Sequence, residues 1–399
     1  MVDFRADDTA ELRAWRREVR GFLEENWPKG KIFEFDYDED EAGWGEYRQF
    51  WQKVGQKGWI ALTWSPEYYG LGRSAIENWI LQEEFSYWGA PAHPVIGIYV
   101  ANAILRLGTH EQRLKYLKGI AEGTEYWAEG YSEPSAGSDL ASLTTRARRD
   151  GDYWVLNGQK TLGTAAQHCK WMNVLARTGP DGGRQNGISC FVVPLDAPGV
   201  QLLPIENMAD GTQNQTFFDN VRLPADSLLG DEGEAWKQVW FGMGGDKLDN
   251  TGPYPEPHFF RMVRTLNTVI RYCRETKRGR TALADDPVIR QKLGELICGV
   301  EAFKLLFHEA YSDVISPGGK GPSVMLTTMT SIHLKEFWPH LAQVCMEIVG
   351  PLAQLQGGKW AQLQGHIEKF FRASFGNHAG GTSQLKRMVL ATRWLGLPR

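Results

Sequence analysis

The feature that most constrains the fold is a change in residue pattern along the chain, from helical spacing to short β-rich runs and back. From Thr9 to about Gly123, apolar residues recur at three- and four-residue intervals, as one buried face of a helix requires. From Tyr126 to about Leu229, short apolar runs are separated by turn signals, a pattern typical of strands. Helical spacing returns at Ala235 and continues toward the end. The predicted order is therefore helical, β, helical.

The length of 399 residues agrees with this division, because a single hydrophobic core rarely serves more than about 300 residues. We predict a mostly α fold with a central β-domain, divided at 1–125, 126–234 and 235–399. Asp150-Gly151 lies between two β-rich runs and predicts a tight hairpin in the middle domain. In the last domain the spacing predicts helices at 259–276, 287–312, 323–348 and 366–372.

Composition argues against several classes of protein. A net charge of −4 gives no electrostatic case for nucleic acid. Five cysteines lie far apart without a CxxC pair, which argues against a disulfide framework and structural zinc and suits a reducing compartment. No apolar stretch is long enough to span a bilayer, and the first residues lack the apolar run of a signal peptide. We therefore predict a soluble, cytoplasmic protein with no metal and no membrane insertion.

Several catalytic motifs are absent from the sequence. It contains no GxGxxG after a strand and no GxxxxGK[ST], so neither a nicotinamide-type Rossmann site nor a phosphate loop is indicated. It also contains no HExxH and no GxSxG, which removes the simplest zinc-hydrolase and serine-hydrolase interpretations.

The most specific motif present is GYSEPSAGSDL at 130–140. Its proline disfavours helical backbone at Glu133, the residue before it, and its small residues let backbone and hydroxyl approach a ligand closely. GTHEQRLKYLKGI precedes the motif, and GDYWVLNGQKTLGTAA, FDNVRLPADSLLG and GGTSQLKRMVLATRWLGLPR follow it. In this order, and across nearly the whole chain, these segments resemble the acyl-CoA dehydrogenase family.

The resemblance implies an N-terminal helical domain, a middle β-barrel-like domain and a C-terminal four-helix bundle. It also implies bound FAD, an acyl-CoA substrate, an electron-transferring flavoprotein or similar acceptor, and a tetramer of identical or different chains. The residues that would contact FAD are Tyr131, Ser132, Leu162, Thr164, Gly350, Thr382 and Gln384. The residues that would contact the substrate are Ser138, Gly380 and Gly381.

The sequence departs from the family at several of these positions. Leu162 stands where an aromatic residue is often found, and Gly163 where a bulkier one is, so the resemblance implies a wider pocket beside the flavin. Glu347 replaces a glutamine near the flavin pyrophosphate, where an acidic group is unfavourable. The arginine that usually contacts this pyrophosphate is not placed by the sequence; Arg271 and Arg274 are the candidates, and surface charges are the alternative.

A further departure concerns the catalytic base. Many family members hold a carboxylate at the position of Gly380. A subgroup similar to isovaleryl-CoA dehydrogenase holds it on the first helix after the β-domain, where this chain has Asp246-Lys247. Asp246 is therefore the candidate base, with Asp249 and the absence of any base in this subunit as alternatives.

The segment after Asp246, TGPYPEPHFF, contains three prolines that prevent ordinary helix. Together with Leu162 and Gly163 it suggests a cyclic, branched or otherwise bulky acyl group. Three other functions stay open: a subunit of a heteromeric dehydrogenase without its own complete site, another flavoenzyme such as a monooxygenase or oxidase on the same fold, and a binding protein that has lost catalysis.

Overall fold

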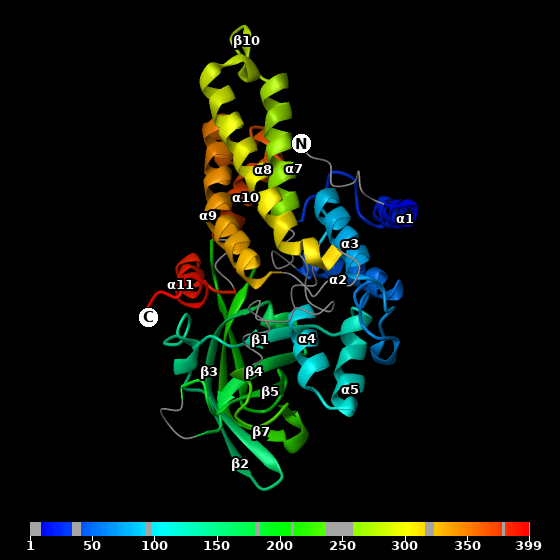
Figure 1. Cartoon of the computed structure of the whole chain (residues 1–399), viewed down its shortest axis with the longest axis vertical. Helices are drawn as coiled ribbons and strands as arrows, with labels where there is room; N and C mark the ends of the chain where they lie inside the picture. Colours follow the sequence, from blue (N-terminus) through cyan, green and yellow to red (C-terminus); the bar gives the residue numbers. More distant parts are fainter. Residues whose placement is uncertain are drawn as a thin grey trace. The chain divides into compact units, whose positions relative to one another are not determined.

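A computed structural model describes residues 9–33, 41–91, 97–179, 184–208, 211–236, 258–315, 323–376 and 380–398. Its elements follow the predicted order, helical, β, helical (Figure 1). The helices are α1 (Ala10–Asn26), α2 (Glu41–Gln56), α3 (Ala75–Trp88), α4 (Ile98–Leu107), α5 (His110–Ala121), α7 (His258–Glu275), α8 (Pro287–Ile315), α9 (Val324–Val349), α10 (His366–Phe375) and α11 (Ser383–Arg393). The strands are β1 (Trp127–Gly130), β2 (Arg146–Asp150), β3 (Tyr153–Thr164), β4 (Trp171–Arg177), β5 (Ile188–Pro194), β6 (Val200–Ile205), β7 (Gln213–Pro224), β8 (Leu228–Leu229), β9 (Lys277–Arg278) and β10 (Thr281–Ala282).

The chain forms two compact units that do not follow sequence order. The helical unit contains α1, α3 and α7 to α11, and the sheet unit contains α2, α4, α5 and β1 to β8. The helices of 1–125 are shared between the units, because α3 packs on α1, α7 and α8. The division into three domains at 125 and 234 stays a prediction.

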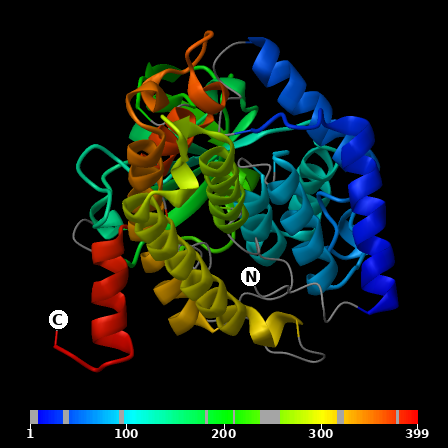
Figure 2. The same ribbon diagram turned by 90° about the horizontal axis from the view of Figure 1, so that it is seen from above.

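The helical unit is built on α7, α8 and α9, which run side by side (Figures 1 and 2). α10 and α11 each pack against α9. The four helices predicted from spacing are confirmed as α7 to α10, with ends that differ by at most three residues. The short β9–β10 hairpin lies in the charged segment between α7 and α8, and α11 was not among the predicted helices. Among the described helices, none combines the length and apolarity that a bilayer crossing needs.

The sheet unit contains an eight-stranded sheet in the order β6-β7-β3-β2-β4-β5-β8, with β1 paired to β4. The predicted hairpin joins β2 to β3, where Asp150 pairs with Tyr153 and Gly151 adopts a φ of +59°. Alternate residues of the strands face one apolar core. Its largest members are Trp154, Leu156, Met172, Val174, Phe191, Phe218, Val221 and Leu223.

A side-chain cap ties α5 to this sheet. Thr109 and Gln112 form a reciprocal capping box at the start of α5, which satisfies backbone donors that the helix leaves unpaired. The Nε2 group of Gln112 also donates to the backbone carbonyls of Asp226 and Leu228, both at 2.8 Å. Gln112 therefore helps to cap the N-terminus of α5 and also anchors that helix beside β8.

Candidate functional site

The candidate site is centred on the segment between β1 and β2. β1 ends at Gly130, and the chain then turns between Glu133 and Ala136, which exchange two backbone hydrogen bonds of 3.0 Å. Pro134 lies inside this turn, where its fixed φ fits and its missing N–H leaves no donor unsatisfied. A 3-10 helix at Leu140–Ser142 completes the segment. The motif recognised in the sequence is therefore an ordered loop at the end of β1.

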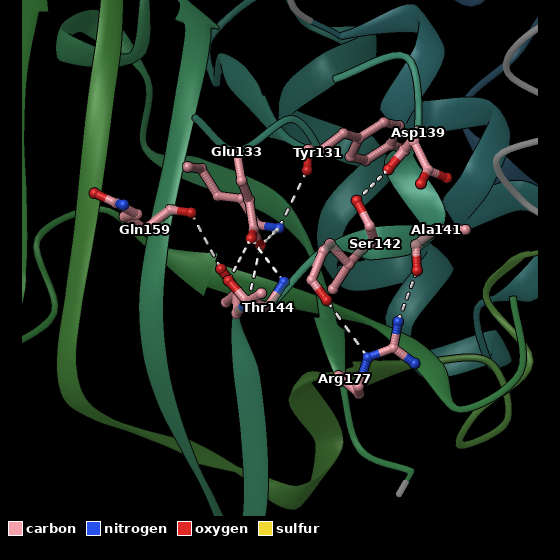
Figure 3. A network of polar contacts seen from close by, with 11 residues as sticks. Tyr131, Glu133, Asp139, Ala141, Ser142, Thr144, Gln159 and Arg177 are labelled. Atoms are coloured by element: carbon pink, nitrogen blue, oxygen red, sulfur yellow. Dashed lines mark hydrogen bonds and ion pairs between the residues drawn. The ribbon is translucent and has the colours of Figure 1, made fainter. Parts of the chain in front are cut away.

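The carboxylate of Glu133 is buried and accepts four hydrogen bonds (Figure 3). Its Oε2 accepts from the backbone N and the hydroxyl of Thr144, both at 2.7 Å, and its Oε1 accepts from the backbone N of Thr145 at 2.9 Å. The fourth donor is Nζ of Lys160 at 2.8 Å. Burial alone would raise the pKa of Glu133, but the Lys160 charge and these hydrogen bonds outweigh it and lower the pKa to about 2. Glu133 is therefore ionised at neutral pH, but a carboxylate with so low a pKa and four donors is a weak base and does not suit the abstraction of a substrate proton.

Lys160 brings the positive charge of this network from β3. Its side chain is 1% exposed, and burial lowers its pKa to about 8, against the opposing effect of Glu133. Besides Glu133, Nζ of Lys160 donates to the backbone carbonyl of Tyr131 at 3.1 Å. At neutral pH both members of this buried pair carry their charges.

Arg177 holds the far end of the loop in place. Its guanidinium lies against backbone carbonyls on both sides, with NH2 donating to Ala141 at 2.9 Å and Nε to Leu143 at 3.4 Å (Figure 3). The same group donates to the carbonyls of Arg184 at 3.1 Å and Asn186 at 3.3 Å. Arg177 thus fixes the 3-10 helix that follows the motif to the loop between β4 and β5.

The structure brings together the flavin residues predicted from the motif and from β3. The backbone carbonyl of Ser132 accepts from the backbone N of Thr161 at 2.9 Å, and Thr164 ends the same strand. Tyr131 lies beside them, and its hydroxyl accepts from Nδ2 of Asn173 at 3.2 Å. Within the described ranges, the half-buried hydroxyls of Ser132 and Thr164 have no hydrogen-bond partner. Hydroxyls held near a surface without partners are available to a ligand.

A bulge in β3 presents Leu162 to solvent. The pairing of β3 with β7 shifts register between Lys160 and Gly163, and Leu162 adopts a φ of +64° with 42% of its surface exposed. Gly163 is buried, and a Cβ added there would meet the methyl carbon of Met172 at 3.4 Å. Leu162 therefore lies at the surface close to Thr164, whereas Gly163 is buried near Met172. The wider pocket beside the flavin stays a prediction.

The positive φ of Leu162 predicts an unusual response to glycine. A left-handed backbone costs an L-residue about 1–2 kcal/mol, which Leu162→Gly would remove, whereas glycine elsewhere in a strand is destabilising. Leu203 is the matched control, since it lies in β6 with 43% of its surface exposed. We expect Leu162→Gly to leave the free energy of unfolding about 1 kcal/mol higher than Leu203→Gly does, measured by urea denaturation. Equal losses in the two variants would contradict this prediction.

Ser138, predicted to contact the acyl-CoA, lies in the exposed part of the same loop. Its neighbour Asp139 accepts a hydrogen bond from the hydroxyl of Ser142 at 2.7 Å through its backbone carbonyl (Figure 3). The loop therefore places Ser138 on the surface between the two anchored ends at Glu133 and Arg177. The substrate contact of Ser138 stays a prediction.

The remaining predicted residues belong to the helical unit. Gly350 ends α9 with a φ of +92°, and Gly380 and Gly381 precede α11 with φ of +70° and +96°. The hydroxyl of Thr382 caps α11 by accepting from the backbone N of Leu385 at 3.2 Å. Gln384 follows in the first turn of α11. Their roles toward FAD and substrate stay predictions.

The backbone at Gly380 bears on the missing carboxylate. An added Cβ would meet no atom within 4 Å, but the φ of +70° is one that a side-chain-bearing residue adopts only under strain. The local backbone thus suits glycine and disfavours a carboxylate residue at this position.

The charges near Gly350 are also resolved by the structure. Glu347 accepts from Nζ of Lys292 at 2.6 Å and from Gln343 at 3.1 Å, and the Lys292 hydrogen bond lowers the pKa of its carboxyl. Its charge is therefore paired. Arg271 and Arg274 are exposed on α7, and neither has an ion pair within the part of the chain that is described. Both remain candidates for binding an anion. Asp246 and Asp249 lie outside the described residues.

The comparisons with known proteins agree with this geometry. Family models match residues 9–124 (acyl-CoA dehydrogenase, N-terminal domain), 128–221 (middle domain) and 259–395 (C-terminal domain). Acyl-CoA dehydrogenase FadE26 of Mycobacterium tuberculosis is 32% identical over 401 residues, which cover 98% of each chain. The chain belongs to the acyl-CoA dehydrogenase family. It is a flavin-dependent oxidoreductase that acts on acyl-CoA thioesters.

Other relatives of this acyl-CoA dehydrogenase are similar along their whole length. Acyl-CoA dehydrogenase IpdE1 of Mycobacterium tuberculosis is 32% identical over 409 residues, covering 98% of each chain. The ChsE4–ChsE5 complex from Mycobacterium tuberculosis gives a TM-score of 0.86 at 31% identity, covering 99% of this chain and 100% of that one. The steroid ACAD Tcur3481–Tcur3483 gives a TM-score of 0.85 at 28% identity, covering 100% of both chains.

Sequence reasoning missed three residues of the site: Lys160, Arg177 and Glu129. Glu129 lies on β1, where protein atoms around its carboxyl keep bulk water away and raise its pKa to about 7. A signal for Lys160 was present, since it shares the alternation of the inward-facing Trp154 and Leu156. No local signal distinguishes Arg177 from a surface arginine, because its partners are backbone carbonyls of other segments.

Proposed function

We propose that this acyl-CoA dehydrogenase binds FAD and oxidises a bulky acyl-CoA thioester between its α- and β-carbons. The observation that carries the proposal is the pair of unpartnered hydroxyls on this part of the sheet unit: Ser132, whose backbone bonds to Thr161 of β3, and Thr164, at the end of the same strand. Polar groups of this kind fit the edge of a flavin ring, which carries hydrogen-bond donors and acceptors. Gly350, with no side chain and a positive φ, allows a phosphate to approach the backbone in the helical unit.

The chemistry divides between cofactor and protein. Bound FAD supplies the acceptor for the β-hydride at its N5 atom. The protein must remove the α-proton, and a positioned carboxylate suits this task. We assign it to Asp246, because the ion pair with Lys160 makes Glu133 a weak base and Gly380 offers no side chain. The acid beside the thioester would thus come from the segment between the sheet and α7.

A bulky acyl group is the substrate class that the residues favour. At the exposed bulge beside Thr164, this chain has Leu162, which is smaller than the aromatic residue often found at this position in the family. The relative Tcur3481–Tcur3483 is named a steroid ACAD, and a ring system of that size is within the proposed class. The acceptor of the electrons would be an electron-transferring flavoprotein or a similar protein.

The same residues also favour a second candidate, a subunit of a heteromeric dehydrogenase. Gly380 lacks the carboxylate, and one similar protein of known structure is a complex of ChsE4 with ChsE5. α11 has no buried residue, so its apolar side chains are available to another chain. We propose that the chain assembles into a tetramer. The test below also distinguishes an active site completed by this chain alone from one that needs residues of a second chain.

The test is the visible spectrum of the purified protein, followed without oxygen while acyl-CoA esters are added. We expect bound flavin, and we expect its bands to bleach with cyclic, branched or steroid-derived esters and little with short straight ones. Best turnover on short straight chains would refute the substrate class. A flavin that no ester bleaches until a second chain is added would favour the shared site, and a colourless protein would refute FAD binding.

A further inference from the structure

The buried ammonium of Lys160 calls for an explanation beyond charge balance. Moving a charged group out of water is costly, so a buried lysine is retained where its contacts require it. Glu133 already accepts three hydrogen bonds from Thr144 and Thr145. Three donors satisfy most of the acceptor capacity of a carboxylate without a cation. The contact that no other side chain of this network makes is the one from Lys160 to the carbonyl of Tyr131.

Lys160 and the next residue hold two consecutive carbonyls of the motif. Nζ of Lys160 donates to Tyr131 at 3.1 Å, and the backbone N of Thr161 donates to Ser132 at 2.9 Å. The two carbonyls belong to the two peptide units on either side of the Ser132 Cα, and each unit is planar, so holding both carbonyls orients both planes. The backbone conformation of Ser132, and with it the base from which its hydroxyl projects, follows from these two planes.

Glu133 in turn holds Lys160 at the required place. A lysine side chain has four flexible bonds and would not point to one carbonyl unaided. Its ion pair with Glu133, itself anchored through Thr144 and Thr145 just before β2, restricts the position of Nζ. The chain of contacts therefore runs from β2 through Glu133 and Lys160 to Tyr131.

We propose that Lys160 is a positioning residue of the flavin site: it links Glu133 to the Tyr131 carbonyl and so sets the peptide that presents Ser132 to the cofactor. The inference rests on the proposed function, since it names the group that prepares that site. It assigns to Lys160 no contact with FAD or substrate, and no proton transfer.

The test compares two variants with a control. Glu133→Gln replaces the carboxylate that positions Lys160 by an amide, whose oxygen can still accept from Nζ, and it keeps the donor to Tyr131. Glu133→Gln/Lys160→Met removes both charges together, so that no buried charge is left unpaired, and it removes the donor to Tyr131. Glu368→Gln/Arg372→Met is the control, because it deletes a largely buried ion pair of α10, 2.7 Å apart, in the helical unit.

Two readouts separate positioning from general stability. The first is the dissociation constant of FAD, measured by titrating apoprotein whose folded fraction is known. The second is deuterium uptake of the apoprotein at 131–133 and at Thr161, whose N–H bonds to Ser132. We expect the Glu133→Gln/Lys160→Met variant to bind FAD at least about tenfold more weakly and to exchange faster at these positions. Glu133→Gln, which loosens Lys160 without removing its donor, should lie between the double variant and wild type, and the control should remain within about threefold of wild type.

Unchanged FAD affinity and unchanged exchange in the double variant would overturn the proposal. So would a loss of affinity that the control pair reproduces, because the effect would then be one of stability alone. A wild-type protein that binds no FAD would refute the proposed function instead. The exchange of Thr161 in the apoprotein would still decide whether Lys160 fixes the Ser132 peptide.

Discussion

Replacing Asp246 with asparagine is expected to slow reduction of the bound flavin by an acyl-CoA ester about 10²–10⁴-fold, while FAD stays bound. Asparagine keeps the size of the side chain but cannot accept the α-proton. The measurement is the rate of flavin bleaching under anaerobic single-turnover conditions, with the best ester found in the substrate panel. The flavin spectrum before mixing shows whether the site is otherwise intact.

Two matched variants make this result specific. Asp249→Asn removes the other carboxylate of the same segment and should change the rate by less than about threefold. Glu129→Gln removes the carboxyl of β1, whose desolvation raises its pKa to about 7 and makes it the described acid best suited to accept a proton near neutral pH. Glu129 directly precedes the motif, so this variant tests the strongest rival within the sheet unit. We expect Glu129→Gln to retain most of the bleaching rate.

The outcomes assign the base unambiguously. If Glu129→Gln abolishes bleaching while Asp246→Asn bleaches at the wild-type rate, the base is Glu129 of β1 and not Asp246. Normal rates in all three variants would show that the proton leaves to a residue of another chain, as the shared-site candidate requires. In that case addition of the partner chain should raise the rate, and the search for the carboxylate would move to it.

The order of elements could be predicted from the sequence because its signals are local. Helical spacing and the Asp150-Gly151 turn depend on residues a few positions apart, and both are confirmed. The assignment of α3 to the helical unit could not be predicted, because it depends on which distant faces pack together. α3 buries polar as well as apolar residues around its surface and shows no one-sided apolar stripe, so its periodicity does not indicate a partner.

The candidate site shows the same limit at the level of single residues. The motif predicted Ser132 and Thr164 as neighbours of one ligand, and the Ser132–Thr161 bond places both on adjoining backbone. The φ of Leu162 could not be predicted, because a branched residue rarely adopts the left-handed region and only the bulge imposes it here. Alternation in β3 points Lys160 inward, but only the three-dimensional structure shows that Glu133 meets it at 2.8 Å.

The second large effect is expected for Arg16→Met, which should lower the free energy of unfolding by about 3–5 kcal/mol. Arg16 lies on α1, and its NH1 group donates to Glu83 at 2.8 Å and to Glu84 at 2.6 Å on α3. All three side chains are at most 7% exposed. Burial alone would raise the pKa of Glu84, but hydrogen bonds from Arg20 and Arg16 lower it, so the carboxylate stays ionised and depends on these cations.

Arg20→Met is the matched control, because Arg20 binds the same carboxylate from a wetter position. Its Nε and NH2 groups donate to Glu84 at 2.7 and 2.8 Å, but its side chain is 38% exposed and Arg16 would still neutralise Glu84 after its removal. We expect its loss to be about 1 kcal/mol, since partly exposed pairs are screened by water. Urea unfolding followed by tryptophan fluorescence and by circular dichroism measures both variants, and differing transitions would show that the two units unfold separately.

A third variant decides what the loss means. In Arg16→Met/Glu84→Gln the cation and one of its two carboxylates are replaced by uncharged side chains of similar size. If the destabilisation arises from charge left uncompensated between α1 and α3, this double variant should recover part of the loss of Arg16→Met. If instead Arg16→Met is as stable as Arg20→Met, water must reach Glu83 and Glu84. The apolar contacts of Trp15, Val19 and Leu23 would then hold α1 in place without the ion pairs.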